Sequence, residues 1–348
     1  MTRALLPGDF PCYAVRVRAA IYVHFPWCLQ RCPYCDFATE AINPQKIPHR
    51  EYARAVTDEL AMRAERFGAP LEPFSLFFGG GTPSLWDHDA LGEVVRAVSA
   101  MGPLREVTVE CNPTSIDRER AQSLRDRGVT RLSLGVQSLR DAHLRYLGRL
   151  HDAAGAVRAL EGAVSAGGLR VSADVMFGMA DQRPDELDED LRRIVGTGVE
   201  HLSCYSLTIE PATRFGELAR KGRLPRLTDD DVALLYERVE RTLGDLGFAH
   251  YEVSNYARPG AESVHNYGYW RGDAYVGLGA GAVGCLPDRD AQHATRWRND
   301  ADAHALIAAV ARGEFPPGET EALDPATRVR EALLLGMRTV EGTDLARV

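Results

Sequence analysis

The chain carries three cysteines within eight residues, in the segment Cys28-Leu29-Gln30-Arg31-Cys32-Pro33-Tyr34-Cys35. Thiolates are the usual protein ligands of iron–sulfur clusters, and a cubane cluster normally takes four of them. Three thiolates in one short loop can therefore hold three irons and leave the fourth iron without a protein ligand. Another molecule can bind at such an open position. The C-x3-C-x2-C spacing thus predicts a [4Fe–4S] site formed by Cys28, Cys32 and Cys35.

Two other uses of clustered cysteines fit this sequence less well. A structural zinc site usually takes four ligands in two spaced pairs, whereas Cys12, Cys111, Cys204 and Cys285 are isolated from one another. A disulfide framework is typical of small secreted chains, and this chain has 348 residues and an odd number of cysteines. We therefore expect reduced thiolates that bind a cluster.

Strand and helix patterns alternate along most of the chain around this loop. Short apolar strands are predicted over 21–24, 73–78, 106–111, 130–136, 170–177 and 201–207, and helices over 49–67, 87–100, 117–127, 153–166, 184–195 and 229–246. Near-continuous apolar strands of this kind indicate a parallel sheet that is buried on both faces. Six units favour an open, partial (β/α)6 barrel over a closed eight-stranded one, with its site at the C-terminal ends of the strands.

The rest of the chain does not follow this alternation of strands and helices. Residues 1–20 are predicted to form a loose leader, 21–247 the barrel, and 248–348 an accessory region that ends in a small helical domain. Within the accessory region the patterns predict a strand over 250–256, loops and short strands over 260–287, and helices over 301–311 and 325–337.

Composition narrows the class of protein. A hydrophobic content of 45% is that of an ordinary globular chain, and a net charge of −8 argues against a nucleic-acid partner. No apolar run approaches the length of a membrane span, and the N-terminus lacks the order of a secretory signal. We therefore expect a cytoplasmic protein, in a compartment that keeps thiols reduced.

The cysteine segment and its flanks carry a family resemblance. The motif has an aromatic residue, Tyr34, before its last cysteine, and it lies between Tyr22-Val23-His24-Phe25-Pro26-Trp27 and Asp36-Phe37. This pattern resembles the radical S-adenosylmethionine (SAM) enzymes. It is most similar to the oxygen-independent coproporphyrinogen III oxidase group and to the heme chaperone branch of that group, from about Ile21 to the C-terminus. The resemblance implies a [4Fe–4S] cluster, SAM at its open iron and an external electron donor. The family's C-terminal domain usually extends further than Val348, so we expect that domain to be partial.

The stretch Gly79-Gly80-Gly81-Thr82-Pro83-Ser84 follows a predicted strand. Glycines allow a backbone to approach a ligand closely because no Cβ intervenes. The resemblance implies that this stretch binds the amino end of the methionine of SAM. Taken alone, it is also compatible with a tight turn into a helix capped by Ser84 or Asp87.

Several polar side chains near the predicted strand ends complete the implied SAM site. Glu110 can accept hydrogen bonds from ribose hydroxyls, Arg149 can bind a carboxylate in a bidentate manner, and Asp174 is costly in an apolar strand unless it is used. The residues implied by the resemblance are Tyr22, Tyr34, Gly80, Gly81, Thr82, Glu110, Gln137, Arg149 and Asp174. Each one alone is compatible with a solvated or structural role. His24 is left open between a locally bonded loop histidine and a group near the cluster.

A second informative stretch is Ser263-Val264-His265-Asn266-Tyr267-Gly268-Tyr269-Trp270. Imidazole and phenolate are both axial ligands of heme iron, and aromatic rings can cover a porphyrin. The stretch resembles the H-N-x-x-Y motif of the heme chaperone branch, which implies heme binding by His265 and Tyr269. The alternative is an aromatic-rich loop over the barrel mouth in which His265 is satisfied locally.

Two functions follow from the resemblance. The first is a heme chaperone that loads heme and passes it to acceptor hemoproteins, a delivery that allows transient membrane contact although no segment argues for it. The second is the oxidase, which decarboxylates two propionates in porphyrin biosynthesis. Three features favour the chaperone. Phe37 stands where the oxidase carries a further cysteine, and only about twenty residues precede the first predicted strand, whereas the oxidase has a longer N-terminal extension. The H-N-x-x-Y motif of the chaperone branch is also present.

Two further readings are set aside. Another radical SAM reaction, such as methyl transfer, would call for a second SAM motif that this chain does not show. The glycines of Gly277-Leu278-Gly279-Ala280-Gly281-Ala282 do not open a βαβ unit, so no dinucleotide site is predicted there.

Overall fold

One twelve-stranded sheet runs through the structure, a computed structural model that describes residues 16–288 and 290–345. Antiparallel strands extend it at both edges: β12 (Val283–Pro287), β13 (Ala294–Asn299) and β14 (Gly318–Leu323) on one side, β10 (Asn255–Ala257) and β9 (Ala249–Glu252) on the other. Its centre is parallel and consists, in spatial order, of β11 (Ala274–Leu278), β1 (Val17–Phe25), β4 (Leu71–Gly80), β5 (Glu106–Cys111), β6 (Arg131–Gln137), β7 (Arg170–Phe177) and β8 (His201–Ser206).

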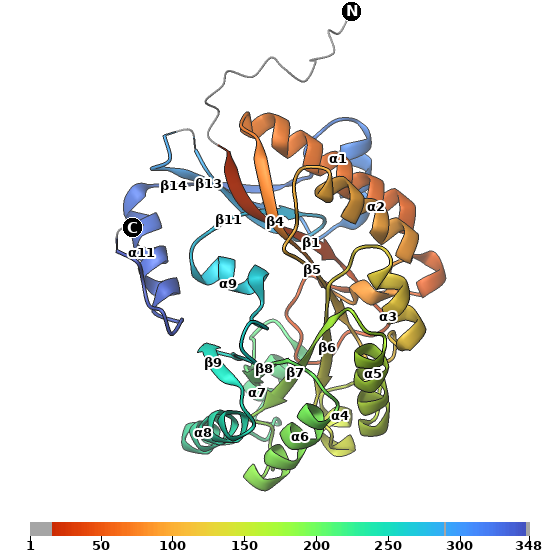
Figure 1. The fold of residues 1–348 in the computed structure, drawn as a ribbon, viewed down its shortest axis with the longest axis vertical. Coiled ribbons are helices and arrows are strands. Elements are labelled where there is room, and N and C mark those ends of the chain that lie inside the picture. Colours follow the sequence, from red (N-terminus) through yellow and green to blue (C-terminus); the bar gives the residue numbers. More distant parts are fainter. Residues whose placement is uncertain (1–15, 289, 346–348) are drawn as a thin grey trace, which may run out of the picture.

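Helices follow the strands and cover the outer side of the sheet, where α1, α2, α3 and α5 lie in a row, whereas α9 lies on the inner side (Figure 1). Asp87, Asp117 and Asp152 cap the N-termini of α2, α3 and α5, each accepting a hydrogen bond from a backbone N–H of the first turn. None of the helices in the described residues is both long and apolar enough to cross a membrane. The helices are α1 (His49–Phe67), α2 (His88–Ser99), α3 (Arg118–Arg125), α4 (Asp141–Tyr146), α5 (Ala153–Ser165), α6 (Pro184–Gly196), α7 (Arg214–Arg220), α8 (Asp229–Asp245), α9 (Val264–Trp270), α10 (Ala303–Ala311) and α11 (Pro325–Gly336).

The predicted partial (β/α)6 barrel is confirmed, and β11 adds a further parallel strand beside β1. The sheet thus continues past residue 247, and the division into a core at 21–247 and an accessory region at 248–348 stays a prediction. β1 begins at Val17, whereas the predicted strand began at Ile21. Most of the predicted leader, including Cys12, lies outside the described residues.

Three local predictions differ from the structure. The single strand expected over 250–256 is an antiparallel hairpin of β9 and β10. The stretch around His265, expected in loops and short strands, forms α9, because Ser263 accepts a hydrogen bond from the Asn266 N–H and caps the helix. The strands are not apolar on both faces. Their outward residues, such as Val109 and Leu132, are buried in the core, but their inward residues are largely polar and surround a cavity.

Candidate functional site

A cavity of about 900 Å3 lies inside the partial barrel and reaches the C-terminal ends of its strands. The cysteine loop forms one wall, the strand ends form another, and α9 contributes from the inner side. Residues that are distant in sequence meet here because parallel strands all end at the same edge of the sheet. The cavity lining includes every predicted site residue: Cys28, Cys32, Cys35, Tyr22, Tyr34, Gly80, Gly81, Thr82, Glu110, Gln137, Arg149, Asp174, His265 and Tyr269.

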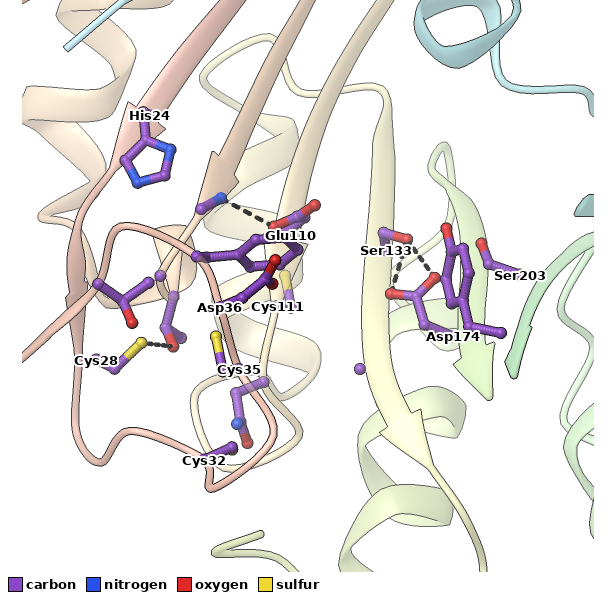
Figure 2. Close-up of a pocket in the computed structure, with 18 of the residues that line it drawn as sticks. His24, Cys28, Cys32, Cys35, Asp36, Glu110, Cys111, Ser133, Asp174 and Ser203 are labelled. Carbon is purple, nitrogen blue, oxygen red and sulfur yellow. Dashed lines mark hydrogen bonds between the residues drawn. The ribbon is translucent and has the colours of Figure 1, made fainter. Parts of the chain in front are cut away.

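The three loop cysteines follow directly from β1. Cys28 ends β2 (Trp27–Cys28), which pairs with β3 (Glu40–Ala41) and closes the loop between them. Figure 2 shows Cys28, Cys32 and Cys35 on this loop. All three are free thiols, and burial raises the pKa of both Cys28 and Cys35. The loop is therefore closed by backbone pairing and not by a disulfide.

The donor set fits a cluster better than a single ion. Among the described residues, no group of three or more His, Cys, Asp or Glu side chains is arranged to hold one metal ion. A cubane cluster binds its cysteines through different irons, so three separated sulfurs around one cavity are what such a cluster requires. Thr82 donates a hydrogen bond to the Cys28 sulfur at 3.6 Å, and Arg149 donates one to the Cys32 sulfur at 3.6 Å. Thr82, after β4, and Arg149, between α4 and α5, therefore already provide contacts for two of the sulfurs.

The glycine stretch after β4 is held against the cysteine loop by close backbone contacts. The N–H of Gly81 donates to the Phe25 carbonyl at 2.7 Å, and a Cβ at Gly81 would lie 2.5 Å from the Trp27 carbonyl oxygen. Gly80 has a φ of 108°, and a Cβ there would lie 2.5 Å from the His24 ring. Glycine is therefore required at both positions by the contacts of the stretch itself.

Two half-buried carboxyl groups, those of Glu110 on β5 and Asp174 on β7, line the cavity. Glu110 accepts a hydrogen bond from the Gly80 N–H at 3.2 Å. Burial and, to a smaller extent, the negative charge of Asp174 together raise the pKa of Glu110 to about 8. Burial also raises the pKa of Asp174, against the opposing hydrogen bonds of Ser203 and Ser133, which lie on either side of it in Figure 2. Burial thus favours the neutral form of both carboxyl groups.

Gln137 and Arg149 come together above Gly135. Gln137 has a φ of 67°, which is uncommon for a residue with a side chain, and the pairing of β6 with β7 shifts register between Gly135 and Gln137. Arg149 donates to the Gly135 carbonyl at 2.8 Å through Nη2 and contacts the Cys32 sulfur through Nη1. Its buried Nε has no hydrogen-bond partner within residues 16–288 and 290–345. An unused guanidinium donor beside a cluster cysteine suits a carboxylate ligand.

His265 is held on the inner side of the barrel by α9. Its Nδ1 lies 2.9 Å from the Ser75 hydroxyl, its ring stacks on Phe77 at 4.9 Å, and the Tyr269 ring meets it edge-on at 5.1 Å. Its buried Nε2 has no hydrogen-bond partner in the part of the chain that the structure describes, although the side chain lines the cavity. Burial lowers the pKa of His265 to about 3, so the imidazole is neutral at physiological pH. The expected alternative, a histidine satisfied locally, accounts for only one of its ring nitrogens.

His24 differs from His265 in this respect. Its Nδ1 lies 3.0 Å from the Tyr22 hydroxyl, and its Nε2 lies 3.0 Å from the Ala38 carbonyl oxygen. Both ring nitrogens are therefore engaged, which favours the local hydrogen-bonding role that the sequence left open. His24 also stands on β1 itself and not in the loop.

Sequence reasoning identified Glu110 and Asp174 but missed their polar neighbours on the inner faces of β5 to β8, such as Thr108, Arg131 and Ser203. Thr108 and Glu110, Arg131 and Ser133, or Ser172 and Asp174 occur at every second position of a strand, which is the period of a strand with one polar face. This alternation of polar and apolar residues could have predicted the polar inner face. It was overlooked because the apolar residues between the polar ones made the strands look buried on both faces.

Comparisons with known proteins give the family. The model of the Radical SAM superfamily matches residues 22–194. The chain is 37% identical over 286 residues to the heme chaperone HemW of Escherichia coli, an alignment that covers 80% of this chain and 74% of that protein. It is 36% identical over 335 residues to HemW of Mycobacterium tuberculosis, with 94% of this chain and 83% of that protein covered.

A solved structure agrees with this family at the level of the fold. The coproporphyrinogen III oxidase HemN from Escherichia coli, described as a radical SAM enzyme, superposes with a TM-score of 0.75 over 94% of this chain and 76% of that chain, at 19% identity. The three-cysteine loop at the ends of the barrel strands and the extent of the sequence matches lead to one conclusion: the chain belongs to the radical SAM superfamily and, within it, to the heme chaperone HemW family.

Proposed function

We propose that this chain is a heme chaperone that binds a [4Fe–4S] cluster, SAM and heme, and that transfers heme to acceptor hemoproteins. The single observation that carries the proposal is the neutral, buried imidazole of His265, whose Nε2 has no partner in a cavity that it shares with the three cysteines. The relatives named heme chaperones give this imidazole its proposed ligand.

The cluster is proposed to be held by Cys28, Cys32 and Cys35. With SAM bound at its open iron and an external electron donor, it would supply the reductive chemistry of SAM. Arg149 is suited to orient the methionine carboxylate through its free Nε, because its Nη1 is already bound to the Cys32 sulfur.

The remaining SAM contacts follow from the same cavity. Gly80, Gly81 and Thr82 would present backbone groups to the methionine amino group, and Glu110 would accept the ribose hydroxyls. The further contacts proposed for SAM are Tyr22, Tyr34, Gln137 and Asp174, all of which line the cavity.

Heme is proposed to bind through its iron to the Nε2 of His265. A histidine that binds a metal usually donates its other ring N–H to a neighbouring oxygen, and the Ser75 hydroxyl lies 2.9 Å from Nδ1 in the position to accept it. The pKa of about 3 keeps the ring neutral, as an iron ligand must be. Tyr269, edge-on to the imidazole, is the second proposed contact. We propose that heme is loaded and released in the cytoplasm and that nucleic acid is not a partner.

The test is a titration of anaerobically reconstituted protein with heme, followed by absorbance. We expect stoichiometric binding by the native chain, a loss of about tenfold or more in affinity for His265→Ala, and no loss for the matched variant His304→Ala, which removes an exposed histidine of α10. The same protein is assayed with coproporphyrinogen III, SAM and a reductant. Turnover to protoporphyrinogen IX would replace the chaperone by the oxidase, and native-like heme affinity of His265→Ala would remove the proposed ligand.

A further inference from the structure

Three polar atoms inside the barrel have no hydrogen-bond partner among the described residues, although their side chains are almost fully buried. They are Oγ1 of Thr108, Nη2 of Arg131 and Nε2 of His265, on residues that are 1%, 2% and 1% exposed. Each of these residues lines the cavity. A buried polar atom without a partner costs about 1–3 kcal/mol, so three such atoms on residues that line one cavity favour a bound ligand there.

The three groups lie in one neighbourhood. Thr108 on β5 and Arg131 on β6 are register partners in adjacent parallel strands, so their side chains leave the same face of the sheet. Nη1 of Arg131 lies 3.7 Å from Oε2 of Glu106. The other oxygen of this carboxylate, Oε1, accepts the backbone N–H of His265 at 3.1 Å. Arg131 and His265 are therefore joined through one carboxyl group.

Glu106 does not satisfy all the hydrogen-bond donors of the Arg131 guanidinium. Besides the His265 N–H, its oxygens accept the N–H of Val264 at 3.2 Å and the hydroxyl of Ser263 at 3.5 Å. Nη1 of Arg131 also donates to the Ala261 carbonyl at 3.0 Å, whereas Nη2 has no acceptor among the described residues. A planar guanidinium with one nitrogen held in place and the other unpaired is suited to an acceptor with carboxylate geometry.

Resting on the heme-binding function proposed above, we propose that Nη2 of Arg131 and Oγ1 of Thr108 bind a propionate carboxylate of the same tetrapyrrole whose iron is bound by His265. Glu110 and Asp174 line the same cavity and would oppose an anion when ionised, but burial raises the pKa of both and so favours their neutral forms. Arg131 is thus a specificity determinant for the carboxylate side chains of the cargo and has no part in binding the iron.

The test compares heme with heme dimethyl ester, which keeps the iron and the ring but carries no ionised propionate. Both are titrated into the anaerobically reconstituted full chain, and the ratio of the two dissociation constants is the readout. We expect the native chain to prefer heme by about tenfold to a hundredfold, the range for a hydrogen bond between charged groups. Because the ratio is measured on one protein sample, it is insensitive to a fraction of unfolded chain.

Variants locate the preference on these residues. Arg131→Gln is expected to bring the ratio close to one, and Thr108→Val to lower it by about fivefold. Arg192→Gln, at an exposed position of α6, is expected to keep the native ratio. Equal affinity of the native chain for the two porphyrins overturns this inference and leaves heme binding intact, as does an Arg131→Gln ratio equal to the native one. Failure of the native chain to bind either porphyrin overturns both this inference and the proposed function.

Discussion

Replacement of Glu110 by Gln is expected to stabilise the ligand-free chain at neutral pH. The unfolded carboxyl titrates near its ordinary value of 4.5, whereas in the fold the pKa of Glu110 is raised to about 8 by burial and by Asp174. Below pH 4.5 the group is protonated in both states. As the pH rises from 4.5 to 8 the unfolded state loses its proton first, so this group lowers the free energy of unfolding over that window.

The size of the effect follows from the same two values. Each pH unit between them changes the free energy of unfolding by about 1.4 kcal/mol for one group. Up to pH 7 the loss is therefore at most about 3 kcal/mol, and about 2 kcal/mol once the coupling to Asp174 is allowed for. Gln keeps the shape and can still accept the Gly80 N–H hydrogen bond at 3.2 Å, but it has no charge to bury.

The assay is urea unfolding of native and Glu110→Gln protein at pH 5 and pH 7.5, without SAM. Titrating groups that do not interact with Glu110 contribute equally to both proteins, so the difference between them reports Glu110 and its coupling to Asp174. We expect the variant to gain about 2 kcal/mol relative to the native chain between the two pH values and to bind SAM about tenfold more weakly. Glu237→Gln, at an exposed position of α8, serves as the control. A variant with the same pH dependence as the native chain would refute the reasoning.

Two further predictions concern the cluster loop. Gly81→Ala is expected to lower the free energy of unfolding by about 1–3 kcal/mol and to weaken cluster retention, because its Cβ would lie 2.5 Å from the Trp27 carbonyl oxygen. The control is Gly244→Ala in α8, where a Cβ meets nothing within 4 Å, and this variant should be neutral or stabilising. Equal stability of the two variants would contradict the prediction. Cys32→Ser is expected to lose its iron, its sulfide and its visible absorbance after reconstitution. Cys285→Ser, which lies outside the cavity lining, should retain all three. A full cluster in Cys32→Ser would show that this cysteine is not a cluster ligand.

The sequence by itself determined the features that depend on short separations along the chain. The spacing of Cys28, Cys32 and Cys35 defines the donor set, because a loop of eight residues cannot place three thiols far apart. The helix over 49–67 was predicted with the boundaries that α1 has, since its apolar period is read within one element. The alternation of strands and helices gave the partial barrel for the same reason.

Only the tertiary structure decided which polar residues share the cavity. Thr108, Arg131 and His265 are separated by tens of residues or more, and they meet through the register of β5 with β6 and through the docking of α9 on Glu106. The sequence did not reveal that docking, because α9 is too short to be stable alone and its cap is one serine. Long-range pairing also placed β11 beside β1 and so carried the sheet past residue 247. All these long-range contacts together decide which polar atoms are left without partners. A local sequence pattern does not contain this information.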